Sequence, residues 1–442
     1  MRRAALRKRG LVTRTLSGLL RQAVRKCRSM DARAVRRMNW LILAIIVAGS
    51  LRLNLLVQAV SYGRANSVRT AETALSLFLS EADYPALLLF ARFRDQALAQ
   101  WLPHACLTYR GKKIVIVDPT PYPKRSRRGK KERQMEYIGR VKVPLKKKQG
   151  RPQETTCPGY LDIWAGLLLK GRQVLPLARK LCSSAHPRFV SQNLLEEAVI
   201  WQALAAVSWN AILVADRGFR RKALLIKLLL RLVDFVIRLA DNIHVLYQEE
   251  WRNILETARQ VEPIGRVVWK EGKKRPLPCW AVAFRAQLRE EGDDPAEPNP
   301  EVNLVVLFPI SSSQEPLILA TSLPVDRLWQ VKAVVKIYEY RWAIETTFEN
   351  MKRDLHLDEF MVREWVAIER LLWAGAMAYT LLVVLRLQAH EESRRFLEEV
   401  LRLLREQAVM GQDLTVGKLR EAIALDYTHH PAQWLAALQE AT

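Results

Sequence analysis

Two short apolar runs, each ending in an aspartate, constrain the fold of this chain more than any other feature. The first is Lys113–Asp118 and the second is Asn210–Asp216. Such runs are typical of strands buried on both faces of a sheet. A predicted helix and another strand follow the second run within residues 220–239, and strand, helix, strand is a parallel crossover unit. We therefore expect both aspartates at the carboxyl ends of neighbouring strands, where clefts form.

Pro119 follows the first aspartate, and we expect it to end that strand. Taken alone, this Asp-Pro pair reads equally well as an ordinary turn. Thr120 is placed to support the carboxylate with its hydroxyl.

A third carboxylate lies in the stretch Ile337–Lys352, which we expect to form one helix. Tyr338, Arg341, Glu345 and Lys352 follow one another at separations of three, four and seven residues, which places all four on one side. An apolar stripe runs beside them, whereas a purely structural helix would turn its charges to the opposite face. The alternative is a surface Arg–Glu pair worth roughly 0.2–0.5 kcal/mol.

The charge of the chain indicates its partner. The 442 residues carry 70 Lys and Arg against 45 Asp and Glu, a net charge of +25. This excess favours nucleic acid over the rival reading, a basic protein at a membrane surface. The apolar run from Leu41 towards Val60 is interrupted well short of about 18 clean residues, so we expect no membrane span. Five cysteines without a CxxC pair read as reduced thiols of a cytosolic protein.

Two segments concentrate the basic residues. Residues 1–37 hold 13 Lys or Arg and one acid, which suits an arm on nucleic acid; a solvated helix and an organelle transit peptide are the alternatives. Residues 123–151 hold another 13, directly after the first aspartate strand, and we interpret them as a phosphate-contacting hairpin rather than a solvated loop. Its candidate DNA contacts are Lys124, Arg125, Arg127, Arg128, Lys130 and Lys131.

Two strand-end aspartates and one helical glutamate can share a metal site. Carboxylate oxygens without His or Cys suit Mg²⁺ or Mn²⁺, and two such ions about 3.5–4 Å apart promote phosphodiester cleavage. Glu349, Asp354 and Asp358 are rival acids near the third position.

The chain resembles a DDE transposase of the insertion sequence 4 family. The Y-x2-R-x3-E-x6-K signature of that family is matched without a gap from Tyr338 to Lys352, and Trp342 and Ile344 extend the match. The D-x-T motif is matched at Asp118, and the DRG[FY] motif at Asp216–Phe219. The resemblance implies an RNase H-like core with a β-rich insertion between the second aspartate and the glutamate.

The resemblance also implies roles for residues. Asp118, Asp216 and Glu345 would hold the metals, and Tyr338, Arg341 and Lys352 would contact phosphates of the transposon end, with Trp342 and Arg217 as further DNA contacts. Some members stack a flipped base on a Trp where this chain has Leu317. That departure leaves a hairpin intermediate open; the possible substitutes are Trp269, Trp280 and Phe308.

The expected fold class is α/β, an RNase H-like mixed sheet with flanking helices, a β-rich insertion and helical terminal regions. The expected divisions are a helical DNA-binding region (1–108), the first part of the core (109–240), the insertion (241–312), the second part of the core (313–385) and a helical, dimerising C-terminal region (386–442), which includes an amphipathic stretch at 391–407.

We expect a DNA transposase that cleaves transposon ends and joins them to target DNA, using Mg²⁺ or Mn²⁺. Its partners would be double-stranded DNA and a second copy in a synaptic complex, with no membrane, in a prokaryotic cytoplasm at the nucleoid. The alternatives are a transposase-derived DNA-binding protein without catalysis and an RNase H-like structure-specific nuclease.

Overall fold

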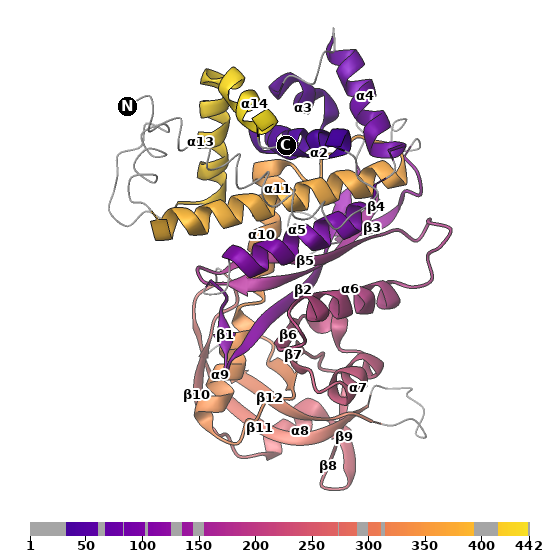
Figure 1. Ribbon diagram of the computed structural model, residues 1–442. Coiled ribbons are helices and arrows are strands. Elements are labelled where there is room, and N and C mark those ends of the chain that lie inside the picture. Colours follow the sequence, from indigo (N-terminus) through magenta and orange to yellow (C-terminus); the bar gives the residue numbers. More distant parts are fainter. Residues whose placement is uncertain are drawn as a thin grey trace.

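A computed structural model describes residues 32–60, 67–82, 84–101, 105–124, 135–144, 154–272, 274–289, 299–310, 314–392 and 414–440. The described chain is built on one continuous mixed sheet (Figure 1). Helices of both terminal regions gather at one end of the molecule, and the insertion forms the other end.

The centre of the sheet carries the two predicted aspartate strands. Strand β2 (Lys112–Pro123) pairs in parallel with β6 (Ala211–Ala215), which pairs in parallel with β7 (Asp234–Arg238). On its other side β2 pairs antiparallel with β4 (Glu154–Leu169), and β4 pairs with both β3 (Gly139–Pro144) and β5 (Gln173–Cys182). The short β1 (Thr108–Tyr109) pairs with the start of β2. The expected α/β class with a mixed sheet is confirmed.

Pro119 does not end the first strand, contrary to our prediction. β2 continues to Pro123 because β6 stops at Ala215, opposite Val117, so that β2 has only β4 as a neighbour beyond that point. A proline is tolerated where one edge of a strand is unpaired, since its missing N–H then faces no partner. Asp118 is therefore the first residue of β2 beyond its pairing with β6.

Residues 241–312, the predicted insertion, extend the same sheet through β13, which follows them in the chain. Strand β13 (Leu317–Thr321) pairs antiparallel with β7 and with β12 (Glu301–Pro309), which pairs with β11 (Leu277–Arg289). The remaining strands are β8 (His244–Tyr247), β9 (Glu250–Asn253) and β10 (Gly265–Trp269), together with helix α8 (Ile254–Gln260). Arg238, at the end of β7, forms an ion pair with Glu271 of the insertion at 3.6 Å. The predicted β-rich character of this region is confirmed.

The helices around the core follow the predicted apolar patterns. Helix α6 (Gln192–Ala206) begins at Ser191, whose hydroxyl accepts a hydrogen bond from Leu194 N, and α7 (Lys222–Leu230) follows β6 through the turn η2 (Arg217–Phe219). The remaining helices belong to the terminal regions and the last part of the core: α2 (Ala32–Ala48), α3 (Leu53–Ala59), α4 (Val68–Ser80), α5 (Ala86–Trp101), α11 (Trp365–Glu392), α13 (Val416–His429) and α14 (Pro431–Glu440).

Helix α11 is long and apolar enough over Trp365–Leu387 to cross a membrane, yet 89% of that window is buried inside the protein. It packs against α2, α4 and α5. Helices α2 and α3 together also pass for a span, but they are bent by 92°. The apolar stretches of α11 and α2 are therefore largely buried inside the protein.

The predicted single helix over 337–352 is wrong. Helix α9 (Leu328–Glu339) ends at a turn, and α10 (Trp342–Leu355) begins after Arg341. Short-range bonds from Arg341 N to Tyr338 O and from Ile344 N to Arg341 O carry the chain through the break. The reading failed because the apolar pattern continues across this turn, so periodicity alone gives no sign of it.

Candidate active site

Asp118, Asp216 and Glu345 converge on one guanidinium. Arg341 Nη1 lies 3.8 Å from Asp118 Oδ2, 4.0 Å from Asp216 Oδ2 and 2.6 Å from Glu345 Oε1. Since all three oxygens lie within 4.0 Å of a single nitrogen atom, any two of them lie within twice that distance of each other. Parallel pairing of β2 with β6 sets the two aspartates side by side, and the first turn of α10 supplies the glutamate.

The cluster carries more negative charge than its cation balances. Burial raises the pKa of Asp118 to about 7; Arg341 opposes this shift, and Glu345 and Asp216 reinforce it. Burial also raises the pKa of Glu345 against the influence of Arg341. Three carboxylates facing one buried guanidinium are stable as neighbours only if a proton or another cation joins them.

Asp216 is fixed by local contacts on both sides. Its Oδ1 accepts a hydrogen bond of 2.8 Å from Arg217 N, the first residue of η2, and one of 3.2 Å from the Tyr338 hydroxyl. Burial and the neighbouring Asp216 raise the pKa of Tyr338 above its ordinary range, so the phenol remains a donor. The carboxylate orientation is therefore set by one backbone and one side-chain donor.

Tyr338 and Arg341, the predicted phosphate contacts, lie beside the carboxylates in this structure. Their exposed fractions are only 3% and 4%, and both face the carboxylates. The reason is electrostatic: a buried acidic cluster attracts the nearest donors inwards.

Lys352 and Lys124 also have protein partners. The Lys352 ammonium donates to Thr120 Oγ1 at 2.7 Å and to Pro121 O at 3.1 Å, and burial lowers its pKa. Lys124 is 8% exposed and donates to the carbonyls of Asp358 and Phe360, and burial lowers its pKa to about 7. In this structure the Lys124 side chain holds the loop after α10, and its contact with DNA stays a prediction.

The other predicted DNA contacts differ in position. Arg217 is exposed beside Asp216. Trp342 is half-buried, and its indole lies against Gly272 of the insertion, where a Cβ would approach the ring to 2.7 Å. Arg125, Arg127, Arg128, Lys130 and Lys131 lie outside the described residues.

The possible substitutes for the base-stacking Trp also differ. Leu317 is fully buried in β13, and Trp269 is 4% exposed. Trp280 is 39% exposed and Phe308 is half-buried, so these two remain accessible.

Sequence reasoning missed the support behind the cluster. Glu196 of α6 is buried near Asp118, accepts a hydrogen bond from Arg221 Nη1 at 2.5 Å and accepts one from Gln192 at 2.8 Å. Arg221 Nη1 also donates to Gly218 O at 3.3 Å. This bridge ties α6 to the turn that carries Asp216. A glutamate in the early turns of a helix gives no local signal of such a partner.

The residues fit a divalent cation in donor chemistry. Carboxylate oxygens are the ligands that Mg²⁺ and Mn²⁺ prefer. Burial is the main cause of the raised pKa of Asp118, and Glu345 and Asp216 add to it. Within the described residues, however, no group of three or more acids, histidines or cysteines stands in metal-binding geometry. Arg341 lies among the carboxylates instead, and it must move for all three to share an ion.

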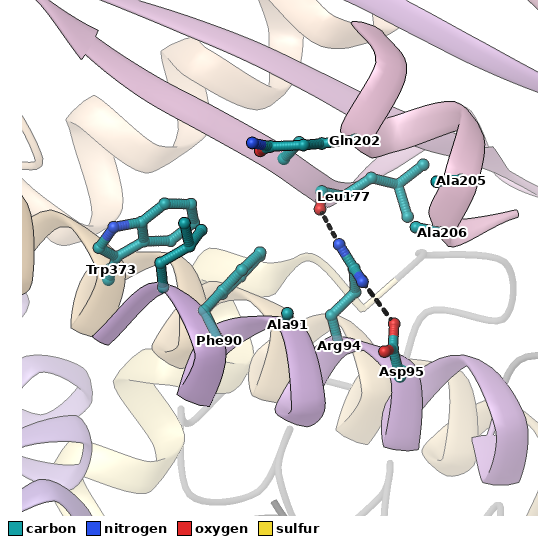
Figure 2. Close-up of a pocket in the computed structure, with 11 residues that line it drawn as sticks. Phe90, Ala91, Arg94, Asp95, Leu177, Gln202, Ala205, Ala206 and Trp373 are labelled. Atoms are coloured by element: carbon teal, nitrogen blue, oxygen red, sulfur yellow. Dashed lines mark hydrogen bonds and ion pairs between the residues drawn. The ribbon is translucent and has the colours of Figure 1, made fainter. Parts of the chain in front are cut away.

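A separate groove of about 390 Å³ lies between α5, β5, α6 and α11, away from the acidic cluster (Figure 2). Its walls are largely apolar, with Phe90 and Trp373 on one side. Its charged residues already have partners, because Arg94 donates to Leu177 O at 2.6 Å and pairs with Asp95. We therefore assign no binding or catalytic role to this groove.

Comparison with known proteins identifies the family of this chain. The profile of the family described as "Transposase DDE domain" matches residues 109–381, which include all three carboxylates. No curated protein matches the sequence significantly. A solved structure of the piggyBac transposase synaptic complex with hairpin DNA is similar to this chain, with a TM-score of 0.46 and 12% identity over 98% of this chain and 81% of that one. That likeness is too distant to bear on residues or function.

Proposed function

Because the chain belongs to the transposase DDE domain family and is a DNA transposase, we propose that it cuts the ends of a mobile element and joins the freed 3′-hydroxyls to target DNA. The observation that carries this proposal is the convergence of Asp118, Asp216 and Glu345 on Arg341. Membership of the family implies nuclease and strand-transfer chemistry. Two divalent ions, Mg²⁺ or Mn²⁺, would supply an activated nucleophile and stabilise the leaving oxygen.

The chain's own residues would divide the work by charge. Asp118, Asp216 and Glu345 would be the ligands, and Tyr338 would hold Asp216 in orientation through the 3.2 Å hydrogen bond. Arg341 offsets part of the negative charge of the cluster in the protein described here. When cations replace it, its guanidinium would be free to meet a phosphate of the bound DNA. Lys352 would hold β2 against α10 through its hydrogen bond to Thr120. It would also present positive charge to the bound DNA.

We also propose the finer assignments made from the sequence. The chain would belong to the insertion sequence 4 family, and residues 1–108 would bind DNA. Further DNA contacts would come from Lys124, Arg125, Arg127, Arg128, Lys130 and Lys131. Arg217, exposed beside Asp216, and Trp342 would be further contacts. The chain would divide into five regions with boundaries after residues 108, 240, 312 and 385. Two copies would pair two DNA ends. The protein would act at the nucleoid. The amphipathic stretch at 391–407 lies mostly outside the described residues.

The experiment is a nicking assay on a labelled duplex that carries the inverted repeat flanking the gene. Glu345→Ala should lower Mg²⁺-dependent nicking at least about 100-fold, because loss of a ligand exceeds loss of a supporting residue. DNA affinity should stay similar or rise, since a negative charge is removed. Glu349→Ala is the matched control: Glu349 is exposed one turn further along α10 and should be dispensable for cleavage.

Normal nicking by Glu345→Ala together with a dead Glu349→Ala would show that the third ligand is misassigned. Cleavage without any joining of ends to a target plasmid would favour the structure-specific nuclease. No cleavage by the wild-type protein on any end would favour a DNA-binding protein without catalysis.

A further inference from the structure

The outward face of α9 carries a strip of cations and aromatic rings that the acidic cluster does not use. Trp329, Lys332, Lys336 and Tyr340 recur at helical spacing on this face, whereas the inner face is buried. Trp329 is 52% exposed. The last residue of the strip, Tyr340, precedes Arg341 of the acidic cluster. The strip therefore runs from the active site to Trp329 at the far end of α9.

Two β-turns add an arginine over each end of the strip. Arg110, in the turn between β1 and β2, lies 5.3 Å from the Trp329 ring centroid, and β1 lies beside α9 (Figure 1). Arg172, in the turn between β4 and β5, lies 6.0 Å from the Tyr340 ring centroid. Lys336 approaches the same ring at 5.7 Å. Segments far apart in the sequence thus bring positive charge to one helix face.

Both turn arginines are held in a costly backbone conformation. Their φ angles are 52° for Arg110 and 58° for Arg172, in the left-handed region that Gly, Asn and Asp adopt more easily. Such conformations persist where the surrounding structure determines them, here in tight hairpin turns. Within the described residues, Arg110, Arg172 and Lys332 form no ion pair with a carboxylate, whereas Lys336 pairs with Glu339 at 2.7 Å. Three cations therefore remain available to an external anion.

We propose that the outward face of α9, with Arg110 and Arg172, is a track for duplex DNA beyond the cleavage site. Eleven residues of helix span about 16 Å, and phosphates advance about 3.4 Å per base along one strand, so the track would follow about five phosphates. Cations of the strip would pair with the backbone without reading sequence, and the rings would keep the arginines extended. This inference rests on the proposed function only in assuming that DNA is cut at the acidic cluster.

The test compares two triple variants of the full chain in EDTA, which prevents cleavage. R110Q/R172Q/K332Q removes the track, and R252Q/R259Q/R285Q removes the same charge from exposed positions of the insertion. The probe is a 30-base-pair duplex of mixed sequence, titrated at several salt concentrations. Thermal unfolding of each variant verifies that it is folded.

The track variant should flatten the slope of log K against log salt by about 2.7, because each lost phosphate contact contributes about 0.9. Between 50 and 200 mM salt the wild type should then lose about 40-fold more affinity than this variant. The control should keep the wild-type slope. Equal slopes for both triple variants would overturn the track. The nicking assay separates the two proposals: a flattened slope in a protein that cannot nick would leave the track standing and remove the proposed chemistry.

Discussion

Two buried ionic clusters lie close together on the central sheet, and they differ in how far their positive and negative charges cancel. Asp162 and Arg179 are both fully buried, joined by two-pronged contacts from Arg179 Nε and Nη2, and Asp162 also accepts from Tyr122 and Trp164. The other cluster sets three carboxylates against Arg341, whose Nε has no partner within the described residues. One cluster is complete within the protein, and the other is short of positive charge.

This difference indicates a structural role for the balanced cluster and a functional role for the unbalanced one. A buried ion pair is tolerated when its geometry is good and its remaining atoms are bonded, as around Asp162. A cluster with surplus negative charge costs stability and is retained where a cation or a substrate completes it. Thr120 pairs with Asp162 in the sheet register, so the complete cluster lies two residues along β2 from the incomplete one. The balanced pair can therefore anchor the strand that presents Asp118.

Breaking the balanced pair should give the largest effect on stability. Arg179→Ala leaves the carboxylate of Asp162 buried without its cation, and we expect a loss of about 3–5 kcal/mol in the free energy of unfolding. Urea denaturation measures it. Removing both partners, in Asp162→Leu with Arg179→Met, should recover most of that loss, because no unpaired charge remains. A loss below about 1 kcal/mol for Arg179→Ala would mean that the pair is not what anchors β2.

Removing one negative charge from the unbalanced cluster should raise the free energy of unfolding. The pKa of Asp118 is about 7 in the folded protein against an ordinary value of 3.8, so the folded state keeps a proton that the unfolded state releases. Stability from this group therefore falls as pH rises from about 4 to about 7. Asp118→Asn avoids that penalty. Without metal, the variant should be about 4 kcal/mol more stable than wild type at pH 8 and nearly equal to it at pH 4. A gain of the same size at both pH values would contradict this account.

The strands could be predicted from local pattern, whereas the choice of Glu345 among the acids of α10 rested on the family resemblance. Apolar runs ending in aspartate define β2 and β6 with little ambiguity, and parallel pairing then follows from the crossover. The inward direction of Arg341 could not be predicted, since spacing places a residue on a helix face without saying which charges face it. The break before α10 was missed for a related reason, because the apolar period passes through it.

Other features depend on contacts between segments far apart in the chain. Lys124 looked like one member of a basic run, yet it holds carbonyls more than two hundred residues away. Glu196 and Arg221 meet because α6 packs behind the Asp216 turn. No local pattern encodes such pairs, so only the folded chain reveals them.

The central claim is that the unbalanced cluster is completed by a divalent cation, and metal-dependent stability tests it most directly. We would measure urea unfolding of wild type, Asp118→Asn and Glu345→Ala in EDTA and in rising MnCl₂ or MgCl₂. At ten times its dissociation constant, a bound ion should stabilise the wild type by about 1.4 kcal/mol, and the two variants should gain far less. An equal gain in all three proteins, or none in the wild type at millimolar metal, would contradict the account.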